Sequence, residues 1–195
     1  MNNVQLREHI RKVAVDNGAL VVGFTKIRHM EPVIVFGFPF IDEWFLKHPF
    51  NTTKRLGKNY LTSKKVQDLV AQILTREGHR VEYKTVLSLY GDFRPMAVAA
   101  GLGKWGRNGL VVNRQYGSGL LFASLFTNAP LEAETTGNYR NIECLCSECN
   151  NCVLSCPARA FEHNRFHLSR CLPNAVRGCA ECLRACRSVL QQPLN

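Results

Sequence analysis

The chain has 195 residues and a mass of 22.0 kDa, with 46% hydrophobic residues, 21% charged residues and a formal net charge of +10. A composition this apolar supports a buried core, which excludes a disordered chain, and no apolar run approaches the roughly 20 residues that span a bilayer. The first residues lack the basic and then apolar order of a signal peptide. We therefore expect a soluble cytoplasmic protein that does not bind a membrane.

The N-terminal part of the sequence predicts a helix followed by two buried strands. Residues 4–17 keep an apolar stripe at helical spacing, with Asn3 as the expected N-cap and Gly18 as the end. Residues 19–24 and 33–38 are short and apolar along their length. Continuous apolar strands of this kind are typical of a sheet that is covered on both faces.

The middle of the sequence continues this alternation of helices and strands. The predicted elements are a helix over 64–77 with Ser63 as N-cap and Gly78 as its end, a strand over 81–89, a helical turn over 95–100, and strands over 110–112 and 120–126. The alternation predicts an α/β (α+β) sandwich for residues 1–142. The polar stretch 132–141 has the composition of a linker, which leaves residues 143–195 as a second domain.

All nine cysteines of the chain lie in its last quarter, between positions 144 and 186. In a reducing compartment such crowding indicates metal ligands and not disulfides. The run CxxCxxCxxxCP, from Cys146 to Pro157, has the spacing of bacterial ferredoxins, in which three cysteines hold one [4Fe–4S] cluster and the fourth holds another. A second, incomplete run covers residues 179–186, and Cys171 upstream can supply its missing thiol.

Exchange of the last cysteine between the two runs predicts two [4Fe–4S] clusters. The predicted ligands of the first cluster are Cys146, Cys149, Cys152 and Cys186. The predicted ligands of the second cluster are Cys156, Cys171, Cys179 and Cys182. Zinc, which also accepts four cysteines, is an alternative metal, and Cys144 is either a spare thiol or a replacement for Cys146. A disulfide scaffold would need a secretory route, which the N-terminus does not indicate.

A glycine-rich segment, residues 101–109, precedes the cysteines. It has four glycines in nine residues, together with Trp105 and Asn108. Glycine lets the backbone approach a flat partner closely and adopt positive φ angles, but the spacing is not that of a dinucleotide-binding loop. The segment therefore fits either a tight structural turn or a cofactor loop.

The glycine segment and the cysteine tail together resemble the epoxyqueuosine reductase family, cobalamin-dependent iron–sulfur enzymes that are related to reductive dehalogenases. Residues 100–110 look like the AGLGWIGKN segment of the family, and residues 57–60 look like its G-x-D-Y segment. Residues 32–38 are similar to the strand that precedes its active-site region. The tail matches cysteine for cysteine, including the isolated Cys171.

The resemblance implies a nitroreductase-like and corrinoid-reductase-like α/β domain with a C-terminal ferredoxin-like domain that holds two [4Fe–4S] clusters. It also implies a corrinoid (cobalamin) on the α/β domain, which receives electrons through the clusters from reduced ferredoxin or flavodoxin. The residues expected at the corrinoid are Tyr60, Gly101, Leu102, Gly103, Trp105, Gly106, Asn108, Gly109, Tyr116 and Ser118.

The chain departs from the family at positions that bear on the reaction. Leu87 stands where the family has a general-acid Asp, and Leu61 stands where it has a His. Asp92 lies near the expected position but out of register, and it is the candidate proton donor. The sequence given stops nine residues after Cys186, without the helical repeats that bind tRNA in the family. We therefore expect reduction of the corrinoid or of a small substrate. The alternatives are an electron-transfer protein without corrinoid and an epoxyqueuosine reductase that acts on tRNA.

Overall fold

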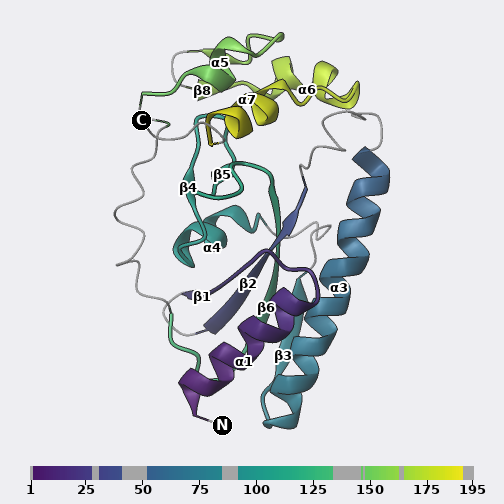
Figure 1. Cartoon of the computed structure of the whole chain (residues 1–195), viewed down its shortest axis with the longest axis vertical. Coiled ribbons are helices and arrows are strands. Elements are labelled where there is room, and N and C mark those ends of the chain that lie inside the picture. Colours follow the sequence, from purple (N-terminus) through teal and green to yellow (C-terminus); the bar gives the residue numbers. More distant parts are fainter. Residues whose placement is uncertain are drawn as a thin grey trace.

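The computed structural model describes residues 2–27, 31–40, 52–84, 92–133, 146, 148–162 and 165–190. At its centre is a four-stranded antiparallel sheet with the strand order β1-β2-β6-β3 (Figure 1). These strands are β1 (Val21–Ile27), β2 (Glu31–Pro39), β3 (Val81–Lys84) and β6 (Leu120–Thr127). The predicted mixed α/β architecture is confirmed.

Two helices, α1 (Asn3–Asp16) and α3 (Thr52–Arg76), cover one face of the sheet (Figure 1). They share a core with Phe24, Phe36 and Phe38, none of which is more than 1% exposed. Each buried aromatic side chain removes a large apolar area from water, so this layer supplies much of the stability of the domain.

The other face of the sheet carries a second, smaller core. It is covered by α4 (Arg94–Ala99) and by a hairpin of β4 (Lys104–Trp105) and β5 (Val111–Val112). Val33 and Val35 of β2 face this layer because successive residues of a strand point to opposite faces. The sheet is therefore covered on both faces, as its apolar strands predicted.

Both predicted N-caps are wrong. Asn2 caps α1 in place of Asn3: its side chain accepts a hydrogen bond from the N–H of Gln5 at 2.8 Å, and the Gln5 side chain accepts one from the N–H of Asn2. This capping box requires a spacing of three residues, which only Asn2 has. Helix α3 begins at Thr52 and continues through Ser63, whose hydroxyl donates to the carbonyl of Tyr60 at 2.9 Å instead of capping a helix.

Several other boundaries differ from the prediction. The strand predicted over residues 81–89 is β3, and residues 85–91 lie outside the described residues. The predicted linker 132–141 is described only to residue 133. Strand β4, inside the glycine segment, was not predicted, because a two-residue strand leaves no periodic pattern in the sequence.

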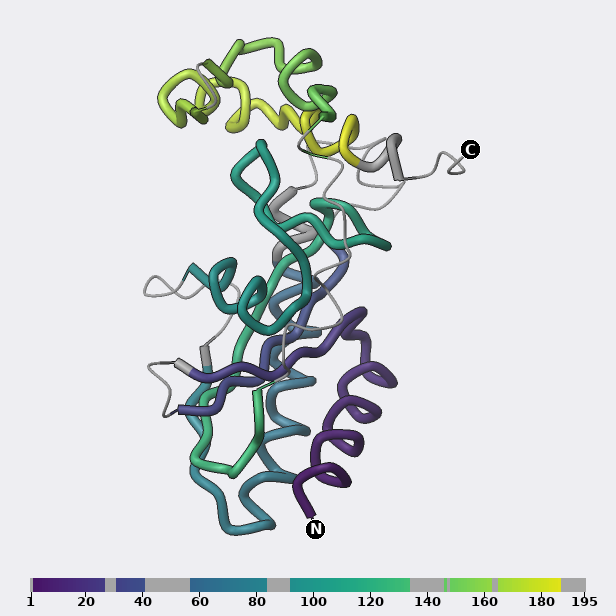
Figure 2. Tube along the Cα trace, turned by 90° about the vertical axis from the view of Figure 1, so that its left-hand side faces the viewer, coloured from purple at the N-terminus to yellow at the C-terminus, as the bar shows by residue number. Residues whose placement is uncertain are grey.

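The cysteine tail lies beyond the β4–β5 hairpin, at the end of the molecule opposite the N-terminus (Figures 1 and 2). Its elements are α5 (Asn151–Leu154), β7 (Phe161–Glu162), β8 (Arg165–Phe166), α6 (Leu168–Val176) and α7 (Glu181–Leu190). In the part of the chain that the structure describes, no helix combines the length and the apolar character needed to cross a membrane.

Candidate metal and cofactor site

The short helices of the tail bring together cysteines that are far apart in the sequence. Helix α5 carries Cys152 and packs against α7, which carries Cys182 and Cys186. Helix α6 carries Cys171.

Cys149, Cys152 and Cys186 form a first group of neighbouring thiols. Burial raises the pKa of the Cys152 thiol, and the charges of Cys186 and Cys149 raise it further. Charges act in this way only over short distances, so Cys149 and Cys186 each lie near Cys152. Cys146 lies on the segment just before them, and its carbonyl accepts a hydrogen bond from Nε of Arg107 at 2.8 Å.

A second group is made by the remaining described cysteines: Cys156, Cys171, Cys179 and Cys182. Burial raises the pKa of Cys182 to about 12, and the charges of the other three members and of Cys152 contribute to this rise. The pKa of Cys171 is raised by burial and by the charges of Cys156 and Cys179. Because Cys182 lies near Cys152 as well, the two groups adjoin.

The donor chemistry of these groups fits iron–sulfur clusters. Several thiols crowded together can ionise jointly only when a cation compensates their charge, and the thiolate is the form that binds metal. The Cys156 sulfur also accepts a hydrogen bond from the N–H of Ala160 at 3.4 Å, a contact of the kind that tunes cluster potentials. Among the described residues, no three His, Cys, Asp or Glu side chains are close enough to hold a single ion. Cys144 lies outside the described residues, and the ligand sets stay a prediction.

The glycine segment forms the β4–β5 hairpin and the turns beside it. A Cβ on Gly103 would lie 2.6 Å from the carbonyl oxygen of Val112, and a Cβ on Gly106 would lie 2.6 Å from Cγ2 of the same residue. Gly101 and Gly109 have positive φ angles of 70° and 73°. Each of the four glycines therefore has a structural reason within the hairpin, and their contact with a cofactor stays a prediction.

Several of the predicted cofactor residues are used inside the protein. Asn108 and Ser118 are 7% and 4% exposed, and Nδ2 of Asn108 donates to the Ser118 hydroxyl at 3.2 Å. Oδ1 of Asn108 accepts a hydrogen bond from the N–H of Leu110. Leu102 is a core residue, and the partly buried Tyr116 packs against the same core. These residues fix the hairpin to the beginning of β6.

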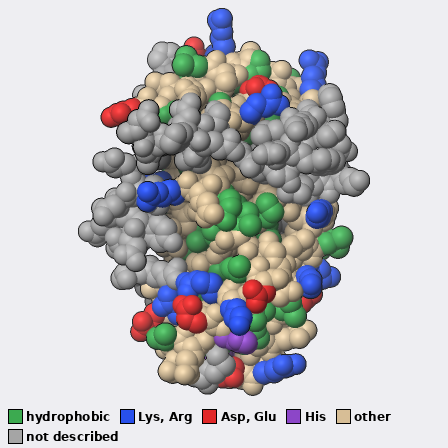
Figure 3. Space-filling model, in the orientation of Figure 1, with side chains coloured by type: hydrophobic (Ala, Val, Ile, Leu, Met, Phe, Trp, Pro, Cys, Tyr) green, Lys and Arg blue, Asp and Glu red, His purple; other side chains and the backbone are tan. Residues whose placement is uncertain are grey.

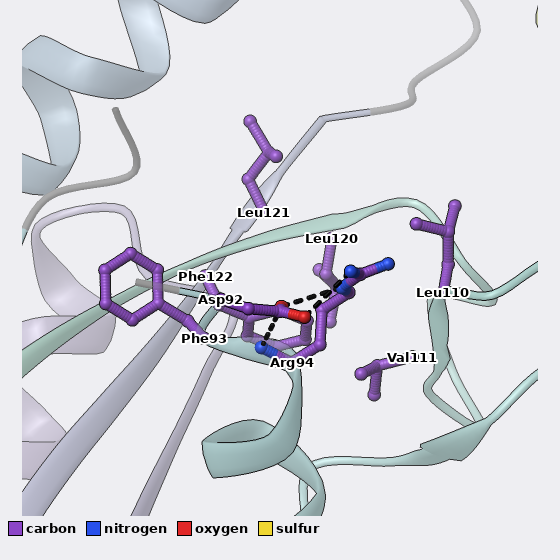
Figure 4. A pocket seen from close by; sticks show the side chains of 8 residues that line it. All are labelled: Asp92, Phe93, Arg94, Leu110, Val111, Leu120, Leu121 and Phe122. Atoms are coloured by element: carbon purple, nitrogen blue, oxygen red, sulfur yellow. Dashed lines mark hydrogen bonds and ion pairs between the residues drawn. The ribbon is translucent and has the colours of Figure 1, made fainter. Parts of the chain in front are cut away.

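Asp92 and Trp105 are linked by one arginine. The guanidinium of Arg94 lies 5.5 Å from the ring centre of Trp105, which is 46% exposed, and it donates to the carbonyl of Gly109 at 2.6 Å. It also pairs with both carboxylate oxygens of Asp92, at 2.7 and 2.8 Å (Figure 4). Their hydrogen bond holds the pKa of Asp92 below its ordinary value. Asp92 is therefore charged at neutral pH, which disfavours it as a proton donor.

A small pocket of about 170 Å³ opens beside the Asp92–Arg94 pair (Figure 4). Its other lining residues are Phe93, Leu110, Val111, Leu120, Leu121 and Phe122. This volume is below the roughly 300–1,000 Å³ of typical cofactor and drug sites. The pocket is therefore too small for a corrinoid.

Tyr60 lies on α3, beside a residue that contacts the end of β2. Its neighbour Asn59 is 3% exposed and donates to the carbonyl of Pro39, the last residue of β2, at 3.0 Å. Pro39 is followed by Phe40, which donates its N–H to the carbonyl of Gly119 at 2.9 Å. Tyr60 and the segment that contains Ser118 are therefore both adjacent to the end of β2.

The contacts that join the sheet to the tail were not found from the sequence. Phe40 packs with Ala180 and Leu183, and Arg107 donates to the carbonyl of Cys146. A single aromatic residue after a strand and one arginine in a hairpin carry no spacing signal, because their partners lie far away in the sequence. Covariation between such pairs would have been the only sequence signal for them.

The chain is similar in sequence to two groups of reductases, although no protein-family model matches it. A tetrachloroethene reductive dehalogenase of Dehalobacter restrictus is 31% identical over 113 residues, which are 56% of this chain and 19% of that protein. An epoxyqueuosine reductase of Lactococcus garvieae is 37% identical over 78 residues, which are 40% of this chain and 21% of that protein. The chain thus spans about a fifth of the length of these curated relatives.

Solved structures of both groups share the fold. An epoxyqueuosine reductase with a tRNA-Tyr stem loop has a TM-score of 0.74 at 16% identity, covering 100% of this chain and 68% of that chain. A reductive dehalogenase whose structure suggests a mechanism for B12-dependent dehalogenation has a TM-score of 0.77 at 16% identity, covering 92% of this chain and 31% of that chain. The predicted resemblance is confirmed: the chain is epoxyqueuosine reductase-like and reductive dehalogenase-like.

Proposed function

We propose that the chain is an iron–sulfur oxidoreductase of two domains, residues 1–142 and 143–195, that relays electrons to a corrinoid or a small substrate. The observation that supports this proposal is that tail thiols from separate elements are neighbours: Cys152 is near Cys149 and Cys186, and Cys171 and Cys182 are near Cys156 and Cys179. When bound, [4Fe–4S] clusters supply one-electron transfer and a corrinoid supplies a strongly reducing metal centre.

In this proposal the residues of the chain hold the tail at a fixed place on the α/β domain. The two cysteine groups would hold the clusters, with Cys146 in the first group. Phe40 packs with Ala180, which is 7% exposed, and with Leu183, so this contact keeps water out between α7 and the sheet. Arg107 fixes the segment around Cys146 from the hairpin side. Two contacts on different elements set the separation of the domains, and electron transfer depends on that separation.

The corrinoid part of the proposal is supported by the similarity to reductive dehalogenases, one of which has been described as B12-dependent. The exposed ring of Trp105 and the position of Tyr60 at the sheet end are compatible with a large flat ligand near the tail. The Asp92–Arg94 pocket is too small for that ligand, so we propose it as a place for a small substrate. Reduced ferredoxin or flavodoxin is the proposed electron donor.

A second function, epoxyqueuosine reduction, has its own support. The epoxyqueuosine reductase solved with a tRNA stem loop covers the whole of this chain, and the Lactococcus garvieae relative has the higher identity of the two curated proteins. Binding of a tRNA stem loop that carries epoxyqueuosine, followed by its conversion to queuosine, would favour this function over reduction of a small substrate.

Iron analysis of protein purified without oxygen tests the proposal. We expect about eight irons per chain and a broad absorbance at roughly 400 nm, and we expect Cys152→Ala to lower the iron content to about four. Stoichiometric zinc without iron would refute the cluster assignment. Cob(II)alamin is then added to the loaded protein and followed by electron paramagnetic resonance. An unchanged spectrum at saturating cob(II)alamin would refute the corrinoid and favour a pure electron-transfer protein.

A further inference from the structure

Helix α6 exposes an apolar stripe, which we call the α6 stripe and define as Leu168, Leu172 and Val176. These side chains are 63%, 52% and 80% exposed, and α6 has no buried residue. Their spacing of four residues puts them on one side of the helix. Three large aliphatic side chains in a row on an exposed helix are costly to keep in water and are typical of a surface that a partner covers.

The surroundings of the α6 stripe are basic. From Arg159 to Arg177 the sequence has four arginines and a single acidic residue, Glu162. That carboxylate pairs with Arg170 at 2.7 Å. Arg165 precedes the stripe and lies opposite Glu162 in the β7–β8 pair, Arg177 follows the stripe, and neither makes an ion pair within the part of the chain that the structure describes. Figure 3 shows Lys or Arg, Asp or Glu and hydrophobic side chains on the same surface at the tail end of the molecule, so the positive charge belongs to the segment around α6 and not to the whole tail. Such a surface complements an acidic protein and repels a basic one.

The α6 stripe also lies next to the second thiol group. Cys171 stands between Leu168 and Leu172 on the same helix, and its thiol neighbours Cys156 and Cys179. A helix with its side chains is about 10–12 Å across. A protein bound on the stripe would therefore lie about one helix diameter from this group, whereas the contact with Phe40 is made by α7 and the residue before it and leaves the stripe open.

We propose that the α6 stripe, with the arginines at its two ends, is the docking surface for an acidic one-electron donor protein. The donor is oxidised by one electron, and the cluster that Cys156, Cys171, Cys179 and Cys182 would hold is reduced by the same electron, with no bond formed or broken. The identity of the acceptor rests on the proposed function, and the docking does not.

Binding of an oxidised plant-type ferredoxin to the full chain, purified without oxygen, tests the proposal. The probe is acidic, and its affinity is measured at low and at physiological ionic strength. We expect Arg165→Glu with Arg177→Glu, and separately Leu172→Gln with Val176→Gln, to weaken binding at least about tenfold. The matched controls are Arg76→Glu at the end of α3 and Val15→Gln, an exposed site on α1, which should bind like the unmodified chain.

Equal affinity in all variants, or affinity that salt does not change, would overturn the proposal. So would a dimer of this chain that buries the α6 stripe, seen as protection of α6 amides from hydrogen exchange at high concentration without ferredoxin. Iron content is measured on the same samples. Iron-free protein that still binds ferredoxin through α6 would refute the proposed function and support the docking surface. Iron-loaded protein that binds ferredoxin at another surface would support the proposed function and refute the docking surface. With loaded protein, dithionite should reduce all variants equally, whereas reduced ferredoxin should reduce the α6 variants about tenfold more slowly.

Discussion

The α/β domain and the cysteine tail are stabilised in different ways. Around the central sheet, side chains as large as Phe24, Phe36 and Phe38 are at most 1% exposed. In the tail, the buried residues among those whose side chains the structure describes are Cys152, Ala160 and Ala180. Two small alanines and one thiol remove little apolar area from water, so hydrophobic burial does not explain why the tail folds.

If the proposed function holds, the tail takes its stability from what its cysteines bind. Short segments without a sufficient core are usually stabilised by metals or disulfides. The described cysteines are all free, so under the proposed function metal coordination would supply this stability. The sheet domain should therefore depend on its packing and the tail on its ligands, and substitutions in one region should leave the stability of the other nearly unchanged.

Removal of metal should produce the largest difference between the tail and the sheet domain. Chelation of the anaerobic protein should abolish hydrogen-exchange protection throughout the tail, because folding and metal binding are the same transition there. Amides of β2 and β6 should keep their protection, since their core contains no cysteine. Exchange measured by mass spectrometry separates the two regions. A tail that stays protected after loss of all metal would show that it folds by packing alone.

The converse test is a substitution in the core of the sheet domain, which should destabilise that domain and leave the tail unaffected. Phe36 is fully buried, and Phe36→Ala should lower the free energy of unfolding of the α/β domain by about 3–5 kcal/mol, through lost apolar burial and the cavity that remains. Urea denaturation followed by circular dichroism measures this loss. Val15→Ala, at a site that is 47% exposed on α1, is the control and should change stability by less than about 0.5 kcal/mol. Loss of iron from the folded Phe36→Ala protein would contradict the independence of the two regions.

The sheet domain was predicted from the sequence more fully than the site was. Apolar runs such as residues 33–38 identify buried strands, because every side chain of a strand covered on both faces is apolar. Helix starts were predicted poorly. Ser63 resembles an N-cap in the sequence, but inside a long helix its hydroxyl bonds back to the carbonyl of Tyr60, so residue type alone does not distinguish the two roles.

In the functional site, too, local sequence patterns did not predict contacts between residues that are far apart in the sequence. Fixed local spacing yields a prediction for the ligands of each cluster, since ligand geometry constrains neighbours along the chain. The glycine segment left two interpretations open, and only the close approach of Gly103 and Gly106 to Val112 shows that the hairpin itself requires glycine. Phe40 and Arg107 contact partners more than 30 residues away, which no local pattern encodes.

A smaller effect should come from the Asp92–Arg94 pair that fixes the hairpin to α4. The pKa of Asp92 is lowered in the folded state, so its charge stabilises the fold above the pKa of the unfolded chain, about 3.9, and this stabilisation is lost as pH falls through the lower folded value. Both side chains are partly exposed, so Asp92→Asn should cost only about 0.5–1 kcal/mol at pH 7 and less at an acidic pH, where the carboxylate begins to be protonated. Urea denaturation at the two pH values measures the difference, with Glu132→Gln at an exposed site as the control. A cost that is the same at both pH values would mean that packing, and not charge, is the contribution of Asp92.

The smallest effect should come from the point where the two regions meet. Arg107→Ala removes the hydrogen bond from the hairpin to the carbonyl of Cys146, a contact that contributes about 0.5–1.5 kcal/mol. Because this bond restrains the segment that precedes the first thiol group, its loss should speed iron release to a chelator by about two- to tenfold while the urea midpoint of the sheet domain stays the same. Arg107→Lys retains a donor and should recover part of the effect, and Arg114→Ala, at an exposed turn beside β5, should have none. Iron release that is unchanged in Arg107→Ala would show that this hydrogen bond does not restrain the cluster ligands, and that other contacts, such as the packing of Phe40 against Ala180 and Leu183, hold the tail on the sheet domain.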